Sequence, residues 1–171
     1  MKNFKEDLMN VRAFVFDVDG VLSASVVPMF PNGEPMRTAN IKDGYVIQLA
    51  VKLGYKIAII TGGHTEAVRV RFSNLGVTDI YMGQSEKLTA YREWTAKHNL
   101  APEQVMYMGD DMPDLPVMQI VGMPVCPIDA AEDVKAVSRY ISPFRGGECC
   151  VRDVMEQVLR AHGHWGTDNT W

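Results

Sequence analysis

Short, continuous runs of apolar residues alternate along the chain with segments of helical periodicity. The runs cover Ala13–Phe16, residues 57–60 and Val105–Met108, and no polar residue interrupts them. An unbroken apolar run is typical of a strand that is buried on both faces of a parallel sheet. These runs therefore predict strands of a mainly parallel sheet with helices packed on both sides.

Segments with apolar residues three and four positions apart, as on the buried face of a helix, follow these runs. Glycine, the usual residue just past a helix end, follows three of the segments at Gly54, Gly76 and Gly163. The alternation predicts right-handed β-α-β units in a single α/β domain over residues 1–162, with a tail at residues 163–171. The apolar positions are Val46, Leu49, Ala50 and Leu53; Val68, Phe72 and Leu75; Leu88, Tyr91 and Trp94; and Val151, Val154, Met155, Val158 and Leu159.

Residues 23–40 break this alternation. Asn32 and Gly33 form a strong hairpin-turn signal, and Pro28 and Pro35 keep the flanking strands out of a sheet centre. We expect a small β-hairpin that projects from the domain as a flap, with a plain ordered loop as the alternative. Its apolar residues would be exposed, which usually means that a partner covers them.

Composition and charge exclude several classes of protein. The chain has 171 residues, of which 47% are hydrophobic and 22% charged, so it has enough apolar mass for a folded core. Its net charge of −4 argues against general nucleic-acid binding. No apolar run approaches the roughly 20 residues that span a bilayer, and no secretory signal is recognisable. With three cysteines and no disulfide framework, we expect unpaired thiols and a cytoplasmic protein.

Two carboxylates, Asp17 and Asp19, follow the first predicted strand in the sequence Asp17-Val18-Asp19-Gly20. If they share a face at about 4 Å, their repulsion is on the order of 4 kcal/mol at an effective dielectric constant near 20. Such a pair needs a cation or a shared proton, although two acids that cap a helix are the alternative.

A second acidic group follows the strand that ends at Met108. It contains Asp110, Asp111 and Asp114. If this strand lies near the first, Asp110 joins the earlier pair in a site of oxygen ligands that suits Mg²⁺. Asp111 is also suited to cap a helix, with Pro113 near its start, and both interpretations can hold together.

Two further signals complete the series. Thr61, Gly62 and Gly63 end a strand just before a predicted helix, where a hydroxyl and free backbone amides could hold a phosphate group. An ordinary glycine-rich turn is the alternative. Lys87 stands at the start of the next helix, where its ammonium group could neutralise a phosphoryl group, although a lone lysine is usually solvated.

The order acid pair, hydroxyl, lysine, acid cluster resembles the motif series of the haloacid dehalogenase-like phosphatases. The resemblance implies a Rossmann-like three-layer sandwich and covers the chain from about Val11 to Leu159. No gap is long enough for the large cap domain of many relatives. The hairpin in its place, Gly146-Gly147 and the following Val151-Arg152 look like the capless subfamily of the 3-deoxy-D-manno-octulosonate 8-phosphate phosphatases.

The resemblance implies roles for the motif residues. Asp17 would be the nucleophile, and Asp19 the general acid and base. Mg²⁺ would be held by Asp17, the backbone carbonyl of Asp19, and Asp110. The phosphoryl group would be bound by Thr61, Gly62 and Lys87, and the surrounding shell would contain Asp111 and Asp114.

The resemblance also implies a sugar phosphate substrate and a homotetramer, in which the hairpins form a hub and a neighbouring subunit partly closes each site. Contacts to the sugar are expected from Gly63, His64, Arg69 and Arg152. Gly63 departs from the long polar residue that the family often has there, so a nine-carbon keto-sugar acid 9-phosphate or another small sugar phosphate remains an alternative substrate. A receiver-like signalling domain has the wrong order of motifs, and a catalytically silent structural module would not need both Asp17 and Asp19.

Overall fold

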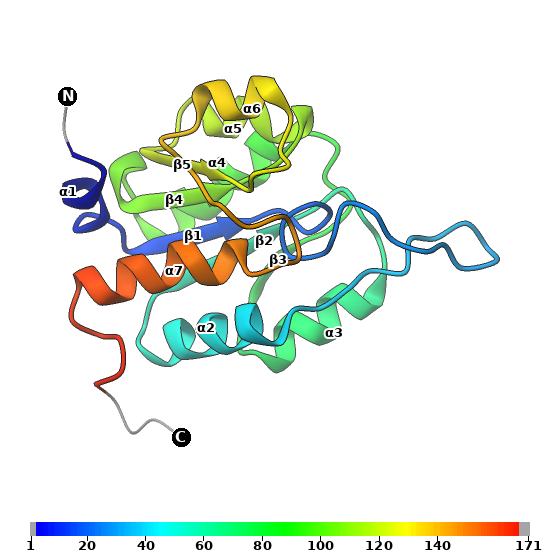
Figure 1. Ribbon diagram of the computed structural model, residues 1–171, viewed down its shortest axis with the longest axis horizontal. Coiled ribbons are helices and arrows are strands. Elements are labelled where there is room, and N and C mark those ends of the chain that lie inside the picture. Colours follow the sequence, from blue (N-terminus) through cyan, green and yellow to red (C-terminus); the bar gives the residue numbers. More distant parts are fainter. Residues whose placement is uncertain (1–2, 168–171) are drawn as a thin grey trace.

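The computed structural model describes residues 3–167 and has a six-stranded parallel sheet at its centre (Figure 1). The strand order is β3-β2-β1-β4-β5-β6, so the first strand lies in the middle. This arrangement confirms the predicted parallel α/β fold. The strands are β1 (Ala13–Phe16), β2 (Lys56–Ile60), β3 (Asp79–Tyr81), β4 (Val105–Met108), β5 (Met123–Cys126) and β6 (Tyr140–Ile141).

The register of the three central strands brings their carboxyl ends to one edge. Phe16 of β1 is paired with Ile59 of β2 on one side and with Met108 of β4 on the other. The polar residues that follow these strands therefore start from the same edge, as expected for the ligand site of an open α/β sheet.

Helices cover both faces of the sheet and make a three-layer sandwich (Figure 1). Alternate residues of β1 face opposite layers: Phe14 and Phe16 join one buried cluster, whereas Ala13 and Val15 join the other. The first cluster contains residues of α2, α3 and α7, and the second contains residues of α4, α5 and α6. The helices are α1 (Phe4–Leu8), α2 (Ile41–Lys52), α3 (Glu66–Asn74), α4 (Lys87–His98), α5 (Leu115–Met118), α6 (Glu132–Val137) and α7 (Cys150–Ala161), with 3-10 turns η1 (Pro102–Gln104) and η2 (Met112–Asp114).

The segment between β1 and α2 projects from the body of the molecule (Figure 1). The expected turn forms, with Gly33 in the left-handed region and a backbone bond from Phe30 N–H to Glu34 C=O. Regular strands do not form, because the pairing is limited to one bridge between Met29 and Pro35, and proline has no N–H to extend a ladder. Val26 and Met29 are 90% and 72% exposed.

The C-terminal segment folds back onto α7. The guanidinium carbon of Arg152 lies 4.5 Å from the centre of the Trp165 ring. Trp165 also packs edge-on against Tyr45. The predicted tail at residues 163–171 extends beyond the described residues at position 168. Over residues 3–167 the three cysteines are unpaired, and none of the helices there has the length and apolar character needed to cross a membrane.

Candidate active site

A cavity of about 600 Å³ opens at the carboxyl edge of the sheet. Asp17 and Asp110 come from the ends of the adjacent strands β1 and β4. Gly62 and Gly63 follow β2, and Lys87 is the first residue of α4. The topology therefore brings together residues of all four sequence motifs.

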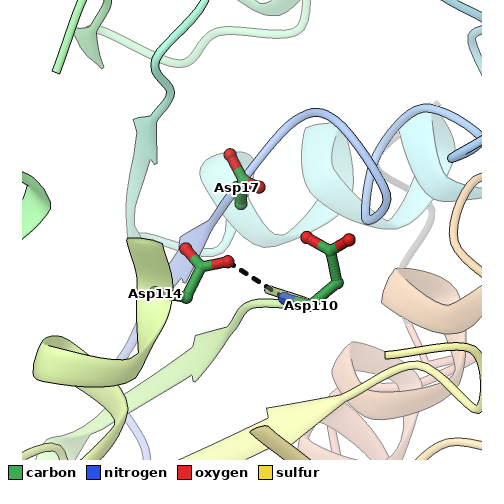
Figure 2. A group of neighbouring side chains, drawn as sticks. All are labelled: Asp17, Asp110 and Asp114. Carbon is green, nitrogen blue, oxygen red and sulfur yellow. Dashed lines mark hydrogen bonds between the residues drawn. The ribbon is translucent and has the colours of Figure 1, made fainter. Parts of the chain in front are cut away.

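Three carboxylates form the acidic side of this cavity (Figure 2). Asp17, Asp110 and Asp114 each place one oxygen within 4.8 Å of the others. Burial, together with the negative charge of Asp114, raises the pKa of Asp17 to about 7. Burial and the charge of Asp17 raise the pKa of Asp110 to about 8. The arrangement concentrates negative charge that a cation would stabilise.

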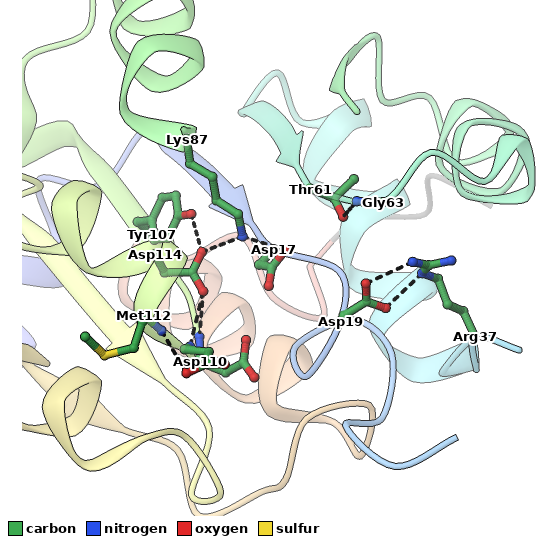
Figure 3. A network of polar contacts seen from close by, with 11 residues as sticks. Asp17, Asp19, Arg37, Thr61, Gly63, Lys87, Tyr107, Asp110, Met112 and Asp114 are labelled. Atoms are coloured by element: carbon green, nitrogen blue, oxygen red, sulfur yellow. Dashed lines mark hydrogen bonds and ion pairs between the residues drawn. The ribbon is translucent and has the colours of Figure 1, made fainter. Parts of the chain in front are cut away.

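Asp114 is the fully bonded member of this cluster (Figure 3). Its Oδ1 accepts hydrogen bonds from Lys87 Nζ at 2.7 Å and from the Tyr107 hydroxyl at 2.6 Å. Its Oδ2 accepts from the backbone N–H groups of Asp110 and Asp111 at 3.0 and 3.3 Å. With both oxygens occupied, Asp114 supports its neighbours and has little capacity to coordinate a metal.

Lys87 bridges two of the carboxylates. Its Nζ lies 2.8 Å from Asp17 Oδ1 and 2.7 Å from Asp114 Oδ1. Although burial disfavours the ammonium form, the charges of these carboxylates raise the pKa of Lys87 above its usual value. Lys87 is therefore a fixed cation beside Asp17.

Asp110 has the features of a metal ligand. Its Oδ1 is buried and has no hydrogen-bond partner, which is costly unless another ligand satisfies it. Its Oδ2 lies against Gly20, where an added Cβ would be 1.9 Å away, and Gly20 also has a φ of +84°. The close approach requires glycine on both counts. Two or more carboxylate oxygens with room for water fit a small hard cation such as Mg²⁺.

Asp19 does not pair with Asp17, contrary to the expected repulsion between these two residues. β1 ends at Phe16, and Asp19 lies in a turn closed by a bond from Ser23 N–H to Val18 C=O. Its carboxylate accepts two bonds from Arg37, at 2.8 Å from Nε and 3.0 Å from Nη2 (Figure 3). The negative charges that lie close together are instead those of Asp17, Asp110 and Asp114.

The loop after β2 provides the polar backbone of the opposite wall. The Thr61 side chain is buried, and its hydroxyl accepts a bond from Gly63 N–H at 3.1 Å. The Gln84 N–H donates to the Thr61 carbonyl at 3.0 Å, which joins this loop to the one before α4. The loop therefore has a fixed shape beside the carboxylates.

Comparison with known proteins agrees with this arrangement. Residues 57–145 match the haloacid dehalogenase-like hydrolase family. The 3-deoxy-D-manno-octulosonate 8-phosphate phosphatase KdsC of Escherichia coli K12 is 41% identical over 154 residues, which cover 90% of this chain and 82% of the relative. The chain belongs to the haloacid dehalogenase-like hydrolase family.

Solved structures of haloacid dehalogenase-like hydrolases share the whole fold. A crystal structure of 3-deoxy-D-manno-octulosonate 8-phosphate phosphatase from Yersinia pestis has a TM-score of 0.89 and 38% identity, covering 94% of this chain and 86% of its own. The enzyme of the same name from Moraxella catarrhalis has a TM-score of 0.86 and 33% identity, covering 92% and 90%. That structure contains a magnesium ion, a phosphate ion and a KDO molecule.

The expected sugar contacts in this haloacid dehalogenase-like hydrolase are only partly at the cavity. Gly63 lines it, but three others lie elsewhere in the described chain. The His64 ring packs beside Gly83, Arg69 lies 3.8 Å from Glu66, and Arg152 bonds to Glu156 at 2.7 Å. Gly63 is therefore the expected sugar contact that lines the cavity, and the sugar contacts of His64, Arg69 and Arg152 stay predictions.

The cavity is also lined by polar residues that were not predicted from the sequence, among them Gln84 and Ser85 of the loop before α4. Arg37 and Ser25, from the projecting segment, line the cavity but belong to no motif. Asp111 is the predicted cap, because its side chain accepts from Met112 N–H at 2.8 Å at the start of η2. A single arginine after a proline-rich turn has no sequence signal that distinguishes it from a solvated one.

Proposed function

We propose that this chain is a Mg²⁺-dependent phosphatase that hydrolyses 3-deoxy-D-manno-octulosonate 8-phosphate to the free keto-sugar acid and phosphate. The observation that supports it most directly is the pairing of Asp17 with Lys87 at 2.8 Å beside the partnerless Oδ1 of Asp110. A nucleophile, a fixed cation and a carboxylate oxygen that can coordinate a metal ion lie in one cavity, and this combination suits phosphoryl transfer. The similarity to enzymes of that name supports the choice of substrate.

Asp17 is the proposed nucleophile. One of its carboxylate oxygens attacks phosphorus in line with the sugar oxygen, and the bond from phosphorus to that oxygen breaks as an aspartyl-phosphate forms. A water molecule then attacks phosphorus, releases phosphate and restores the Asp17 carboxylate. These two steps replace one difficult displacement by two easier ones.

Asp19 is the proposed general acid and base. It gives a proton to the departing sugar oxygen and later takes one from the attacking water, which balances the two steps. Its carboxylate is held by Arg37 through both oxygens, so that contact must loosen before Asp19 can serve the leaving group.

The remaining residues bind charge. Asp17, Asp110 and the backbone carbonyl of Asp19 would hold Mg²⁺, which supplies neutralisation of the phosphoryl oxygens when bound. Lys87, the Thr61 hydroxyl and the Gly62 N–H would bind phosphoryl oxygens, and Asp114 fixes Lys87. Asp111 stabilises the turn that positions Asp110 and Asp114.

We further propose a cytoplasmic homotetramer that acts in lipopolysaccharide-sugar synthesis. The projecting segment supports assembly, since Val26 and Met29 expose apolar surface that a second copy could cover. A neighbouring subunit that completes each site would also supply sugar contacts that this chain alone lacks. A nine-carbon keto-sugar acid 9-phosphate is the second candidate substrate, because Gly63 stands where the family often has a long polar side chain near the sugar.

Phosphate release tests the proposal. The enzyme is assayed with Mg²⁺ and then with EDTA on 3-deoxy-D-manno-octulosonate 8-phosphate, a nine-carbon keto acid 9-phosphate and D-arabinose 5-phosphate. A Mg²⁺-dependent preference of about 100-fold for the first, or about 2.7 kcal/mol, is expected. Asp17→Asn should eliminate release, whereas Asp133→Asn, an exposed acid on α6, should leave it intact. Wild-type rates in Asp17→Asn would exclude the nucleophile, and equal rates on all three compounds would exclude the substrate.

A further inference from the structure

Among the described residues of the projecting segment, Arg37 is the one that forms an ion pair with a residue of the cavity, Asp19. Its side chain is 13% exposed although it comes from an otherwise solvated segment. Nε and Nη2 bond to the two oxygens of Asp19 at 2.8 and 3.0 Å, and Nη1 bonds to Thr65 Oγ1 at 2.8 Å. All three nitrogens are engaged, so the guanidinium group has one defined orientation.

Gly63 makes this orientation possible. A Cβ at position 63 would lie 2.6 Å from Arg37 Nη2 and 3.2 Å from Cζ. Gly63 is absent from the glycines with positive φ, so its backbone does not require glycine. The reason for glycine here is space: its missing side chain is replaced by the guanidinium group of Arg37.

The cationic side chains that line the cavity indicate which substrate group Arg37 could bind. Among the described residues that line it, Lys87 and Arg37 are the lysine and arginine side chains. Lys87 is already held between Asp17 and Asp114, where the phosphoryl group would be bound. A keto-sugar acid phosphate has a second anionic group, and Arg37 is the cation left for it within this chain.

We propose that Arg37 selects substrates that have a carboxylate, by exchanging Asp19 for the carboxylate of the sugar acid. This inference rests on the proposed function. Both partners are planar carboxylates that accept two parallel bonds, so the exchange replaces one bidentate pair with another. A neutral sugar phosphate offers no replacement, and Asp19 then stays bonded to Arg37 instead of turning to the leaving oxygen. Selection therefore acts on kcat as well as on KM.

Two substrates and three variants test this role. Wild type, Arg37→Ala, Arg37→Lys and Gly63→Ala are compared on 3-deoxy-D-manno-octulosonate 8-phosphate and on D-arabinose 5-phosphate, which lacks a carboxylate. Arg37→Ala should lower kcat/KM on the keto acid about 10- to 100-fold, the effect expected when bonds to a charged group are lost. On D-arabinose 5-phosphate its kcat should stay the same or rise, since Asp19 is released.

The other variants separate charge from geometry. Arg37→Lys keeps the charge but loses the two parallel bonds, so it should recover part of the preference. Gly63→Ala keeps Arg37 but displaces it, so it should lose part of the preference. Arg92→Ala, which removes an exposed arginine from α4, is the matched control and should keep the wild-type ratio. Thermal unfolding of each variant verifies that it is folded.

The outcomes distinguish this inference from the proposed function. If Arg37→Ala keeps the wild-type ratio between the two substrates, or loses activity on both equally, then Arg37 does not select the carboxylate. If wild type itself shows no preference for the keto acid, the proposed substrate is wrong and the inference is overturned with it.

Discussion

Lys87 Nζ lies 2.7 Å from Asp114 Oδ1, in an ion pair that is almost completely removed from water. The same ammonium group contacts Asp17, so Asp114 determines where the cation stands relative to the proposed nucleophile. A buried pair of this kind contributes less through attraction than through the penalty for breaking it. Position, more than stability, is therefore its main contribution.

Asp114→Asn should impair both stability and turnover. The amide keeps an acceptor but cannot satisfy all four donors that the carboxylate satisfies, and one unsatisfied buried donor costs about 1–3 kcal/mol. Urea unfolding should show a loss in this range, and kcat should fall because Lys87 is less well fixed. Asp133→Asn serves as the surface control. An unchanged kcat in a destabilised Asp114→Asn protein would contradict the positioning role.

Lys87→Met should destabilise the protein, since it leaves Asp17 and Asp114 without their shared cation. Breaking a buried pair in this way costs about 3–5 kcal/mol. The double variant Lys87→Met/Asp114→Asn should lose less unfolding free energy than the sum of the losses in the two single variants. The difference, which is the coupling energy, should be about 0.5–3 kcal/mol. Urea unfolding of the four proteins measures this coupling, and strict additivity would show that the two residues act independently.

Mg²⁺ should stabilise the folded protein before any substrate is present. A ligand at 100 times its Kd stabilises by about 2.7 kcal/mol, which thermal unfolding detects as a higher Tm. Asp110→Asn should remove most of this shift because the carboxylate with the partnerless oxygen is lost. Without Mg²⁺ the same variant should be at least as stable as wild type at pH 8, since it relieves the crowding with Asp17. A full Mg²⁺ shift in Asp110→Asn would exclude this residue as a ligand.

Asp43 should make stability depend on pH. Its Oδ1 accepts from Arg152 N–H at 2.8 Å, its Oδ2 is buried without a partner, and burial raises its pKa from 3.8 to about 6. The folded state then holds the proton more tightly than the unfolded state. Its contribution to stability is complete below about pH 4 and is lost as pH rises to about 6.

Unfolding at several pH values with saturating Mg²⁺ measures this effect. Between pH 4 and pH 7 the free energy of unfolding should fall on the order of 2–3 kcal/mol further in wild type than in Asp43→Asn, because the variant has no carboxyl group at this position. The comparison uses the slopes with pH, so an overall destabilisation of the variant does not affect it. Parallel slopes in the two proteins would show that Asp43 does not titrate in this window.

The sequence alone was sufficient for the central strands, the main helices and the motif residues at the strand ends. β1, β4 and most of β2 are continuous apolar runs, and this pattern reflects burial on both faces of each strand. Asp17 follows β1 directly and Asp110 follows β4 after one glycine, so a parallel sheet brings them to one edge. The strands β3 and β6 were not predicted because they have only three and two residues. The strand β5 was not predicted because it contains Pro124, and proline argues against a strand inside a sheet.

Only the tertiary structure decided which side chains meet. Asp19 binds Arg37 instead of crowding Asp17, and Asp114 binds Lys87, 27 residues away in the chain. Arg152 faces Glu156 and Trp165 instead of the cavity. Residues at strand ends are placed by local pattern and sheet register, which the sequence determines. The partner of a charged side chain depends on the path of a distant loop or the rotation of a helix, and those follow from the packing of the whole chain.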